Sequence, residues 1–217
     1  MRRGRTPSVS IHGARALRSF VAMRDIVQAG LNSPDPGELY QFALARVSPL
    51  VEATFASVYL MDGASEVMRL VGAYNWPERF RPRLSEVRVR VASGPSGQAA
   101  AERRMVRVDD VQAAGELADW HEIASELGFR AIVALPLVAN SNVLGVLTFY
   151  FAQGVRLGDD AIEFMQVTAD QLAAYAEKTQ LEEALRRVHA RLVEAEAERD
   201  RLAAERSATR EEEPGEH

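Results

Sequence analysis

Two apolar stretches joined by a polar turn decide the fold of this chain: Arg130-Ala-Ile-Val-Ala-Leu-Pro-Leu-Val138, the turn Asn140-Ser-Asn142, and Val143-Leu-Gly-Val-Leu-Thr-Phe-Tyr-Phe151. Such a pair is typical of a β-hairpin whose strands are largely buried. After Gly158-Asp-Asp160 the pattern changes to that of a helix, and no Gly or Pro interrupts it before Pro214. A sheet that runs into a long helix predicts a domain that receives a signal and passes it along a rod.

The residues before the hairpin predict an alternation of helices and short strands. Helices are expected from Ala16 to near Gly30, from Glu38 to Val51 with Asp35 as N-cap and Pro36 in the first helical position, over a short segment 98–103, and over 116–127 with Gly128 as C-cap. Strands are expected over 55–61, 67–74, 87–91 and 105–108, with a turn at Asp62-Gly63.

Consecutive hairpins with helices between them predict an α+β fold, in which helices pack against a central antiparallel sheet. The 217 residues suffice for one core of ordinary size and an extension. We therefore expect a disordered basic tail over 1–14, a globular domain over 15–176, a coiled-coil helix over 177–207 and a disordered acidic tail over 208–217.

Composition restricts the classes of function. Hydrophobic residues make up 47% and charged residues 26%, which is typical of a folded soluble protein. The longest apolar run, from Val143 to Ala152, is shorter than a membrane span and contains Gly145 and Thr148. No secretory signal follows the basic start, so a cytoplasmic protein without membrane association is expected. The absence of cysteine excludes disulfides, thiolate metal sites and redox thiols.

The two ends of the chain differ in charge. Residues 1–24 carry six arginines and no acid, while residues 211–213 are all glutamate, and the formal net charge of the whole chain is −5. An arginine-rich end can contact nucleic acid or acidic lipid. The alternative is a short solvated arm, and no specific nucleic acid is expected as a partner.

Groups suited to catalysis or metal binding do not converge in the sequence. The four histidines are isolated from one another: His12, His121, His189 and His217. His121-Glu122 resembles the start of a zinc-protease motif, but the second histidine is replaced by Ser125, which makes His121 an ordinary surface or pocket-edge residue. We therefore predict no catalytic residues and no metal site.

Two short polar motifs allow a functional and a structural interpretation. Ser93-Gly-Pro-Ser-Gly97 could present backbone N–H groups to an anion, although it lacks the Gly-Lys-Ser/Thr ending of a phosphate loop. A tight connection without a ligand is the alternative. Asp109-Asp110 could be a metal or acid–base pair, but neighbouring residues of a strand point to opposite faces, so a cap or turn is the simpler role.

Aromatic residues gather at the ends of the predicted elements: Tyr74, Trp76, Phe80, Trp120 and Phe129. They could line a small-molecule pocket in which arginines such as Arg79, Arg81 and Arg83 attract an acidic ligand. They could equally close the hydrophobic core, because aromatic side chains dominate both kinds of site.

The C-terminal helix carries a seven-residue apolar repeat. Its steps of four and three residues place Leu181, Leu185, Val188, Leu192 and Leu202 on one seam, with Ala195 and Arg199 between the last two. A helix from Gly158 to about Ser207 would be roughly 75 Å long, more than a domain of this size can cover. We predict a parallel homodimer through this seam. A helix folded back on itself is the alternative, and Arg199 weakens the seam locally.

Three blocks of the sequence resemble the GAF domain family, over roughly residues 22–176. They are Phe55-Ala-Ser-Val-Tyr-Leu-Met-Asp62, then Ser93-Gly-Pro-Ser-Gly-Gln-Ala-Ala100 with Arg104-Met-Val-Arg-Val-Asp-Asp-Val111, and finally Gly128 to Val138 with Leu144-Gly-Val-Leu-Thr-Phe-Tyr150. Each block is short, and their common order and spacing carry the resemblance. It implies a central antiparallel sheet, helices for dimerisation on one face and a ligand cavity on the other.

The resemblance implies where a ligand would bind, but not which one. The candidate cavity residues are those that match cavity-facing strand ends and loops: Trp76, Ser96, Gln98, Asp109, Trp120, Phe129 and Ile132. The Asn-Lys…Phe…Asp signature of the family's cyclic-nucleotide binders is absent, and Lys178 is the only lysine. The bilin-binding and methionine-sulfoxide-reducing branches need cysteine. Haem through His121 stays open on position alone, and the cofactor is unknown.

Three hypotheses of function follow from the sequence. The first is a non-enzymatic sensory or regulatory module that binds a small molecule or a partner and signals through a dimeric C-terminal coiled coil. The second is a ligand-free scaffold of the same fold that serves protein–protein interaction and dimerisation. A small enzyme is disfavoured by the missing catalytic and metal-binding sets. A signalling protein is the expected partner besides the second copy.

Overall fold

The predicted hairpin is present, and it contains the two longest strands of the computed structural model, which describes residues 11–33, 35–63, 65–80, 88–152 and 157–211. Strands β5 (Phe129–Ala139) and β6 (Asn142–Ala152) pair antiparallel along most of their length. Between them lies a two-residue turn in which Asn140 and Ser141 have φ of 45° and 66°. Positive φ at both positions is required for the turn type that matches the twist of a hairpin. Asn142, predicted in the turn, is the first residue of β6.

Six strands form one antiparallel sheet in the order β3-β2-β1-β6-β5-β4. The first hairpin joins β1 (Phe55–Met61) to β2 (Val67–Tyr74), and its bounds agree with the prediction. The two edges are the three-residue strands β3 (Arg88–Arg90) and β4 (Val106–Val108). Because β1 pairs with both β2 and β6, the first and last strands of the chain lie side by side in the middle of the sheet.

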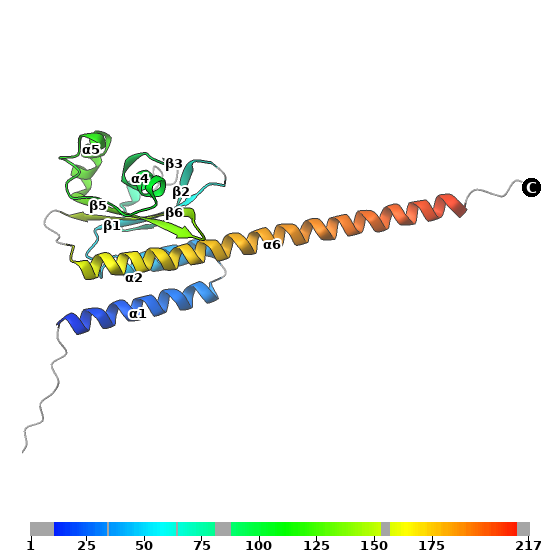
Figure 1. Cartoon of the computed structure of the whole chain (residues 1–217), viewed down its shortest axis with the longest axis horizontal. Helices are drawn as coiled ribbons and strands as arrows, with labels where there is room; N and C mark the ends of the chain where they lie inside the picture. Colours follow the sequence, from blue (N-terminus) through cyan, green and yellow to red (C-terminus); the bar gives the residue numbers. More distant parts are fainter. Residues whose placement is uncertain (1–10, 34, 64, 81–87, 153–156, 212–217) are drawn as a thin grey trace, which may run out of the picture. The chain divides into compact units, whose positions relative to one another are not determined.

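Helices cover both faces of this sheet (Figure 1), as the sequence predicted. One face carries α1 (Ile11–Asn32), α2 (Pro36–Val47) and the first part of α6 (Asp159–Glu211). The other carries α4 (Gly94–Glu102) and α5 (Ala118–Leu127), preceded by the short turns η1 (Glu78–Phe80) and η2 (Gly115–Leu117). The fold is therefore an α+β sandwich of helices and sheet.

Side chains that alternate along each strand pack into hydrophobic cores on the two opposite faces of the sheet. In β1, Ala56 and Val58 pack with residues of α2 and α6, whereas Phe55 and Tyr59 pack on the opposite face. In β6, Tyr150 joins the second of these faces. This alternation is a direct consequence of the two-residue period of a strand.

Several helix bounds differ from the prediction for local reasons. Helix α1 begins at Ile11, so residues 11–14 are helical rather than part of a disordered tail, and Arg15 holds this end by donating to the Leu50 carbonyl at 3.3 Å. Helix α2 ends at Val47 instead of Val51, because Pro49 has no N–H for the helical ladder. Helix α6 continues to Glu211, through residues 208–211 of the predicted acidic tail.

Two end signals in the sequence act as predicted. The carboxylate of Asp35 accepts a hydrogen bond from the Gly37 N–H at 2.8 Å and caps α2. Gly128 ends α5 with φ of 75° and its N–H bonded to the Ala124 carbonyl.

The chain divides into two compact units, Met1–Ala176 and Glu177–His217. No helix among the described residues is long and apolar enough to cross a membrane.

Candidate functional site

An aromatic cluster occupies the sheet face that carries α4 and α5. The ring of Tyr150 lies at its centre, 5.2 Å from Trp76, 5.1 Å from Phe129 and 6.4 Å from Trp120, measured between ring centroids. The first two rings meet Tyr150 edge to face, while Trp120 is stacked on it at an interplanar angle of 25°. Phe55 joins from β1, 5.2 Å from Trp76. Three of the five predicted aromatic residues, Trp76, Trp120 and Phe129, thus surround a tyrosine that the prediction did not include. Phe80 is buried in the same core, whereas Tyr74 packs against the core on the opposite face of the sheet.

Trp76 enters this cluster from the loop that follows β2. The preceding residue, Asn75, has φ of 59°, and its side-chain amide donates to the Thr54 carbonyl at 2.9 Å. Asparagine adopts this left-handed conformation more readily than most residues. The indole N–H of Trp76 donates to the Ala56 carbonyl and to the Ser57 hydroxyl, both at 3.1 Å. The turn and the two hydrogen bonds hold the indole against the sheet.

Buried hydroxyl groups lie beneath the rings on the same sheet face. Ser57 and Thr148 stand opposite each other in the pairing of β1 with β6, and both are fully buried. The Thr148 hydroxyl lies 2.9 Å from that of Ser96, which α4 supplies. Burial raises the pKa of Tyr59 and, more strongly, that of Tyr150. These phenols therefore stay neutral, and the floor of the cluster offers hydrogen bonds without charge.

A groove adjoins the aromatic cluster where α4 faces β4 and η2. Its volume is about 470 Å³, within the range of small-molecule sites. The groove is lined by Ala92, Ser93, Gly94, Pro95, Gln98, Ala101, Glu102, Val108, Glu116 and Leu117. Leu117 and Val108 also belong to the aromatic cluster. A Cβ atom on Gly94 would lie 3.8 Å from the indole nitrogen of Trp120, so the indole borders the start of α4.

Ion pairs between described charged side chains lie near this face. Arg79 binds Glu126 at 2.9 Å, and its guanidinium also lies over the Phe80 ring. Arg130 and Asp110 form a two-point ion pair with distances of 2.8 and 3.1 Å. The hydrogen bonds from Arg130 lower the pKa of Asp110, and those same bonds raise the pKa of Arg130. Arg81 and Arg83 lie outside the described residues.

The seven predicted cavity residues occupy three kinds of place. Trp76, Phe129 and Ile132 are buried in the aromatic cluster, and Trp120 forms its half-buried edge. Ser96 is bonded beneath α4 and Gln98 lines the groove. Asp109 is different, because its carboxylate is 76% exposed and pairs with Arg107 at 2.6 Å.

The polar motifs that allowed two interpretations lie at the start of a helix, in a turn and in α5. Ser93-Gly-Pro-Ser-Gly97 is not a loop, because α4 begins at Gly94 within it. Asp110 caps a turn by accepting from the Gln112 N–H. The His121 ring lies 3.2 Å from the Ala114 carbonyl, and the described residues contain no group of three or more His, Asp and Glu side chains placed to hold a metal ion.

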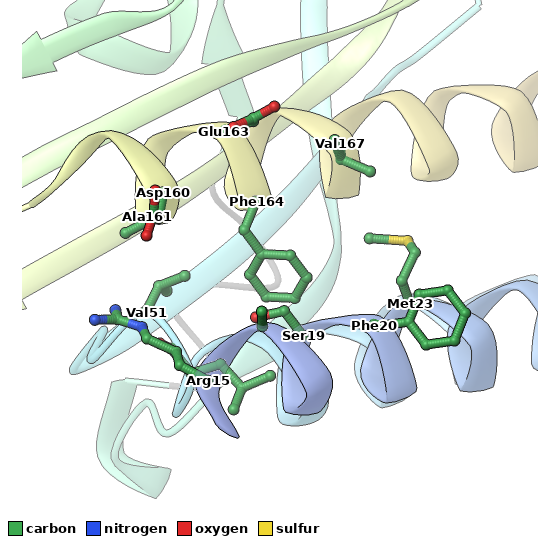
Figure 2. A pocket seen from close by; sticks show the side chains of 12 residues that line it. Arg15, Ser19, Phe20, Met23, Val51, Asp160, Ala161, Glu163, Phe164 and Val167 are labelled. Atoms are coloured by element: carbon green, nitrogen blue, oxygen red, sulfur yellow. The ribbon is translucent and has the colours of Figure 1, made fainter. Parts of the chain in front are cut away.

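A second, apolar groove lies between α1 and α6 on the opposite face (Figure 2). Its volume is about 370 Å³. Phe164 of α6 points toward α1, where Phe20 and Met23 form the facing wall, and Arg15 and Asp160 also line the groove. Phe20 is 69% exposed although it is aromatic.

The outer face of α1 continues this apolar surface. Leu17, Phe20, Val27 and Leu31 are all exposed, and Arg24 completes their three- and four-residue spacing. The opposite stripe of α1, with Ala22 and Ile26, is buried against the body of the domain. Helix α1 therefore buries one apolar face against its own domain and leaves a second apolar face exposed.

The predicted seam of the C-terminal helix is exposed in the single chain. Leu181, Leu185, Val188, Leu192 and Leu202 expose between 46% and 69% of their surface. In the heptad of this seam Leu181 occupies a d position, so Lys178, three residues earlier, occupies an a position. The ammonium of Lys178 lies 3.8 Å from the carboxylate of Glu182.

Comparison with known proteins supplies the relatives of this chain. A family model described as GAF domain matches residues 33–175. The HTH-type transcriptional activator RamA of Corynebacterium glutamicum is 29% identical over 123 residues, which are 56% of this chain and 42% of RamA. The chain thus corresponds to less than half the length of that relative.

Solved structures of similar fold come from several kinds of protein. The GAF domain of a phosphoenolpyruvate-protein phosphotransferase from Coxiella burnetii has a TM-score of 0.66 at 16% identity and covers 78% of this chain and 98% of its own. The corresponding Acinetobacter domain has 0.64 at 17%, with 75% and 94% covered. Free methionine-R-sulfoxide reductase of Neisseria meningitidis, solved with its substrate, has 0.62 at 19%, with 77% and 93% covered. At these identities the likeness concerns the fold alone.

Proposed function

This chain belongs to the GAF domain family, whose members are generally sensory and regulatory modules, and we propose that it is a non-enzymatic member that signals through a dimeric C-terminal coiled coil. In this proposal a small molecule or a partner acts on the face with α4 and α5. Binding on this face would change how the two copies of α6 pack against each other. The single observation that carries the proposal is the exposed heptad seam from Leu181 to Leu202.

The exposed seam supports dimerisation because an uncovered apolar stripe of this length is unfavourable in water. In a parallel pair, Arg191 at a g position would face Glu196 at the e position of the second copy, an attractive arrangement. The α1–α6 groove and the outer face of α1 offer further apolar surface to the same second copy. Both features fit a homodimer built along helices.

The relative RamA, which is described as a transcriptional activator, supports a regulatory role. The non-enzymatic part of the proposal rests on the residues of this chain. It has no cysteine, and the ring of its one histidine near the candidate site, His121, is engaged with the Ala114 carbonyl. A ligand-induced shift between two helix packings requires that the ligand bind the two states unequally.

The only lysine gives a direct test of the parallel coil. In a parallel, in-register dimer the two Lys178 side chains share an a layer, so an amine-reactive bifunctional reagent should join them. We expect a covalent dimer whose linked peptide contains Lys178 twice, and no such peptide from the Lys178→Arg variant. Dimeric mass without that peptide would refute the parallel register.

Substitutions in the seam test the dimer itself. Leu185→Asp together with Leu192→Asp places unpaired carboxylates in the seam, and light scattering should then report a monomer at micromolar concentration. Val193→Asp is the matched control, because Val193 is equally apolar and 51% exposed but lies one position off the seam. A monomeric wild-type chain, or an unchanged mass of the double variant, would overturn the proposal.

One observation favours a second candidate function, the ligand-free scaffold. Trp76, Phe129 and Tyr150 pack so closely that their own rings occupy much of the sheet face where a ligand was expected. A scaffold of this kind would use the coil for assembly alone. Thermal-shift screening separates the two, because a ligand specific for the folded state must raise the unfolding midpoint.

A further inference from the structure

We propose that the coil of α6 recognises a second copy of this chain by charge, because glutamates of the second copy neutralise the cations in its seam. The inference rests on the proposed dimer and specifies what its interface recognises. The two pairs involved are Glu177 with Lys178 and Glu198 with Arg199, which occupy g and a positions of the heptad of the seam. Both pairs lie in the second compact unit of the chain.

The a positions of the coil alternate between apolar and cationic residues, and glutamate accompanies only the cations. These positions are Lys178, Leu185, Leu192 and Arg199. The residues just before the two leucines are Ala184 and Arg191, whereas a glutamate precedes each of the two cations. The sequence repeats the cationic pattern at Glu205-Arg206. Glutamate at g therefore follows the charge of the neighbouring a position.

In the single chain both cations contact acids of their own helix. The Lys178 ammonium lies 3.8 Å from the Glu182 carboxylate, and the Arg199 guanidinium lies 2.8 Å from the Asp200 carboxylate. The side chains of Lys178 and Arg199 are 42% and 73% exposed. Contacts between such exposed groups contribute little to stability, so both cations can exchange them for acids of a second helix.

A parallel second copy supplies these acids. In a parallel coiled coil the side chain at a packs into a hole of the facing helix, and the g residue of the preceding heptad forms part of that hole. Arg199 of one copy therefore lies beside Glu198 of the second copy, and the two-fold symmetry repeats the contact. Lys178 meets Glu177 of the second copy in the same way. Each layer then holds two cations and two carboxylates, which balances the charge that the interface buries.

Other arrangements place the cations against leucine. In an antiparallel pair with full overlap of the seam, Arg199 would oppose Leu181. Lys178 would oppose Leu202, and the g positions would bring Arg191 of one copy beside Arg191 of the other. A cation placed against leucine loses hydration without gaining a counter-charge. A foreign helix that lacks glutamates at this spacing would have the same effect. The pattern therefore specifies orientation, register and partner together.

Exchanged charges test the contact directly. In a homodimer, Glu198→Arg places four cations in this layer, two at position 198 and two at 199, whereas Arg199→Glu places four carboxylates there. Each variant alone should dimerise on the order of tenfold more weakly than wild type, because like charges meet in the interface. In an equimolar mixture each chain meets the opposite charge. Native mass spectrometry, which separates the two chains by mass, should therefore find more heterodimer than random pairing gives.

Matched controls carry the same changes of charge at c positions, which face away from the seam. Glu194→Arg and Arg201→Glu should each dimerise like wild type and form heterodimers only in the proportion of random pairing. Wild-type affinity of Glu198→Arg and Arg199→Glu would overturn the inference. Random pairing of these two variants in the mixture would overturn it as well.

Arg199→Leu supplies a second measurement. The substitution removes the charge from its layer, so self-association should tighten, and light scattering should detect species larger than a dimer because a polar a residue restricts the oligomeric state. An unchanged affinity together with an unchanged mass would contradict the position of Arg199 in the seam.

The mass of the wild-type chain keeps this inference distinct from the proposed function. A monomeric wild type would refute both. A dimeric wild type whose Glu198→Arg and Arg199→Glu variants pair at random would retain the dimeric module and refute recognition by charge.

Discussion

The substitution Gly97→Ala tests how closely α4 is packed against the β3 edge. A Cβ atom on Gly97 would lie 2.1 Å from the Arg90 carbonyl oxygen and 3.2 Å from the Ala92 nitrogen. Reaching a separation of 3.0 Å requires a movement of 3.0 − 2.1 = 0.9 Å, and the contacted atom is backbone. We therefore expect α4 to shift away from the sheet at a cost of about 1–3 kcal/mol, as for other overpacked sites.

The expected cost converts to a measurable change in thermal stability. For a protein of this size each kcal/mol lowers the unfolding midpoint by roughly 2–4 °C, so Gly97→Ala should lower it by about 2–12 °C. Tryptophan fluorescence during heating is the appropriate assay, since it follows the aromatic cluster rather than the C-terminal helix.

The same substitution at a second glycine supplies the control. Gly115 has no atom within 4 Å of a built Cβ, and its φ lies outside the left-handed region, so Gly115→Ala should change stability by less than about 0.5 kcal/mol. Equal midpoints for the two variants would refute the close approach of α4 to Arg90.

Two further predictions concern buried and titratable groups. Tyr40→Phe should leave stability unchanged or raise it by about 1 kcal/mol in urea unfolding, because the buried Tyr40 hydroxyl has no hydrogen-bond partner among the described residues; a loss above 1 kcal/mol would show that the hydroxyl is bonded. Asp110→Asn should remove a pH-dependent contribution to the stability of the fold. The hydrogen bonds from Arg130 lower the pKa of Asp110 in the folded protein, so its carboxylate stabilises the fold at pH values above its ordinary pKa of 3.8. This stabilisation is lost as the pH falls through the lowered pKa. Wild type and Asp110→Asn should therefore differ in unfolding midpoint at pH 6, and this difference should shrink as the pH falls through the lowered pKa of Asp110; a constant difference would contradict the ion pair.

Local patterns predicted the strands well because each one is marked by a period and a boundary. The bounds of β1 and β2 follow from alternation and from Asp62-Gly63, and Gly63 has the φ of 61° expected of a turn. The hairpin of β5 and β6 was equally readable. The ends of the helices were harder to predict from the sequence. A helix can extend through residues without apolar spacing once a contact holds its end, as the hydrogen bond from Arg15 holds the start of α1.

The start of α4 was missed for a different reason. Gly94, Pro95 and Gly97 are residues typical of loops, and only the close approach of Gly97 to the Arg90 carbonyl explains why a helix contains them. That contact joins segments whose spatial relation the sequence does not state. Proline in the first turn of a helix was the available signal.

The candidate site was predicted in part. Trp76, Trp120 and Phe129 were found because aromatic residues at element ends attract notice, and they do meet. Tyr150 and Ser57 lie inside strands, where only the alternation of faces could have assigned them to the same side. Asp109 was included by position, but it follows the end of β4, and its carboxylate is exposed and pairs with Arg107.

The central pairing of β1 with β6 has a consequence for how this protein is made. Residues 62–141, eighty in all, lie between the two strands, so an emerging chain presents the edge of β1, from Phe55 to Leu60, long before its partner leaves the ribosome. Pairings between such distant segments fold slowly, and an open apolar edge invites association with other chains. Fragments that stop before β6 should therefore aggregate, and synthesis of this protein should depend on how long that edge waits for its last strand.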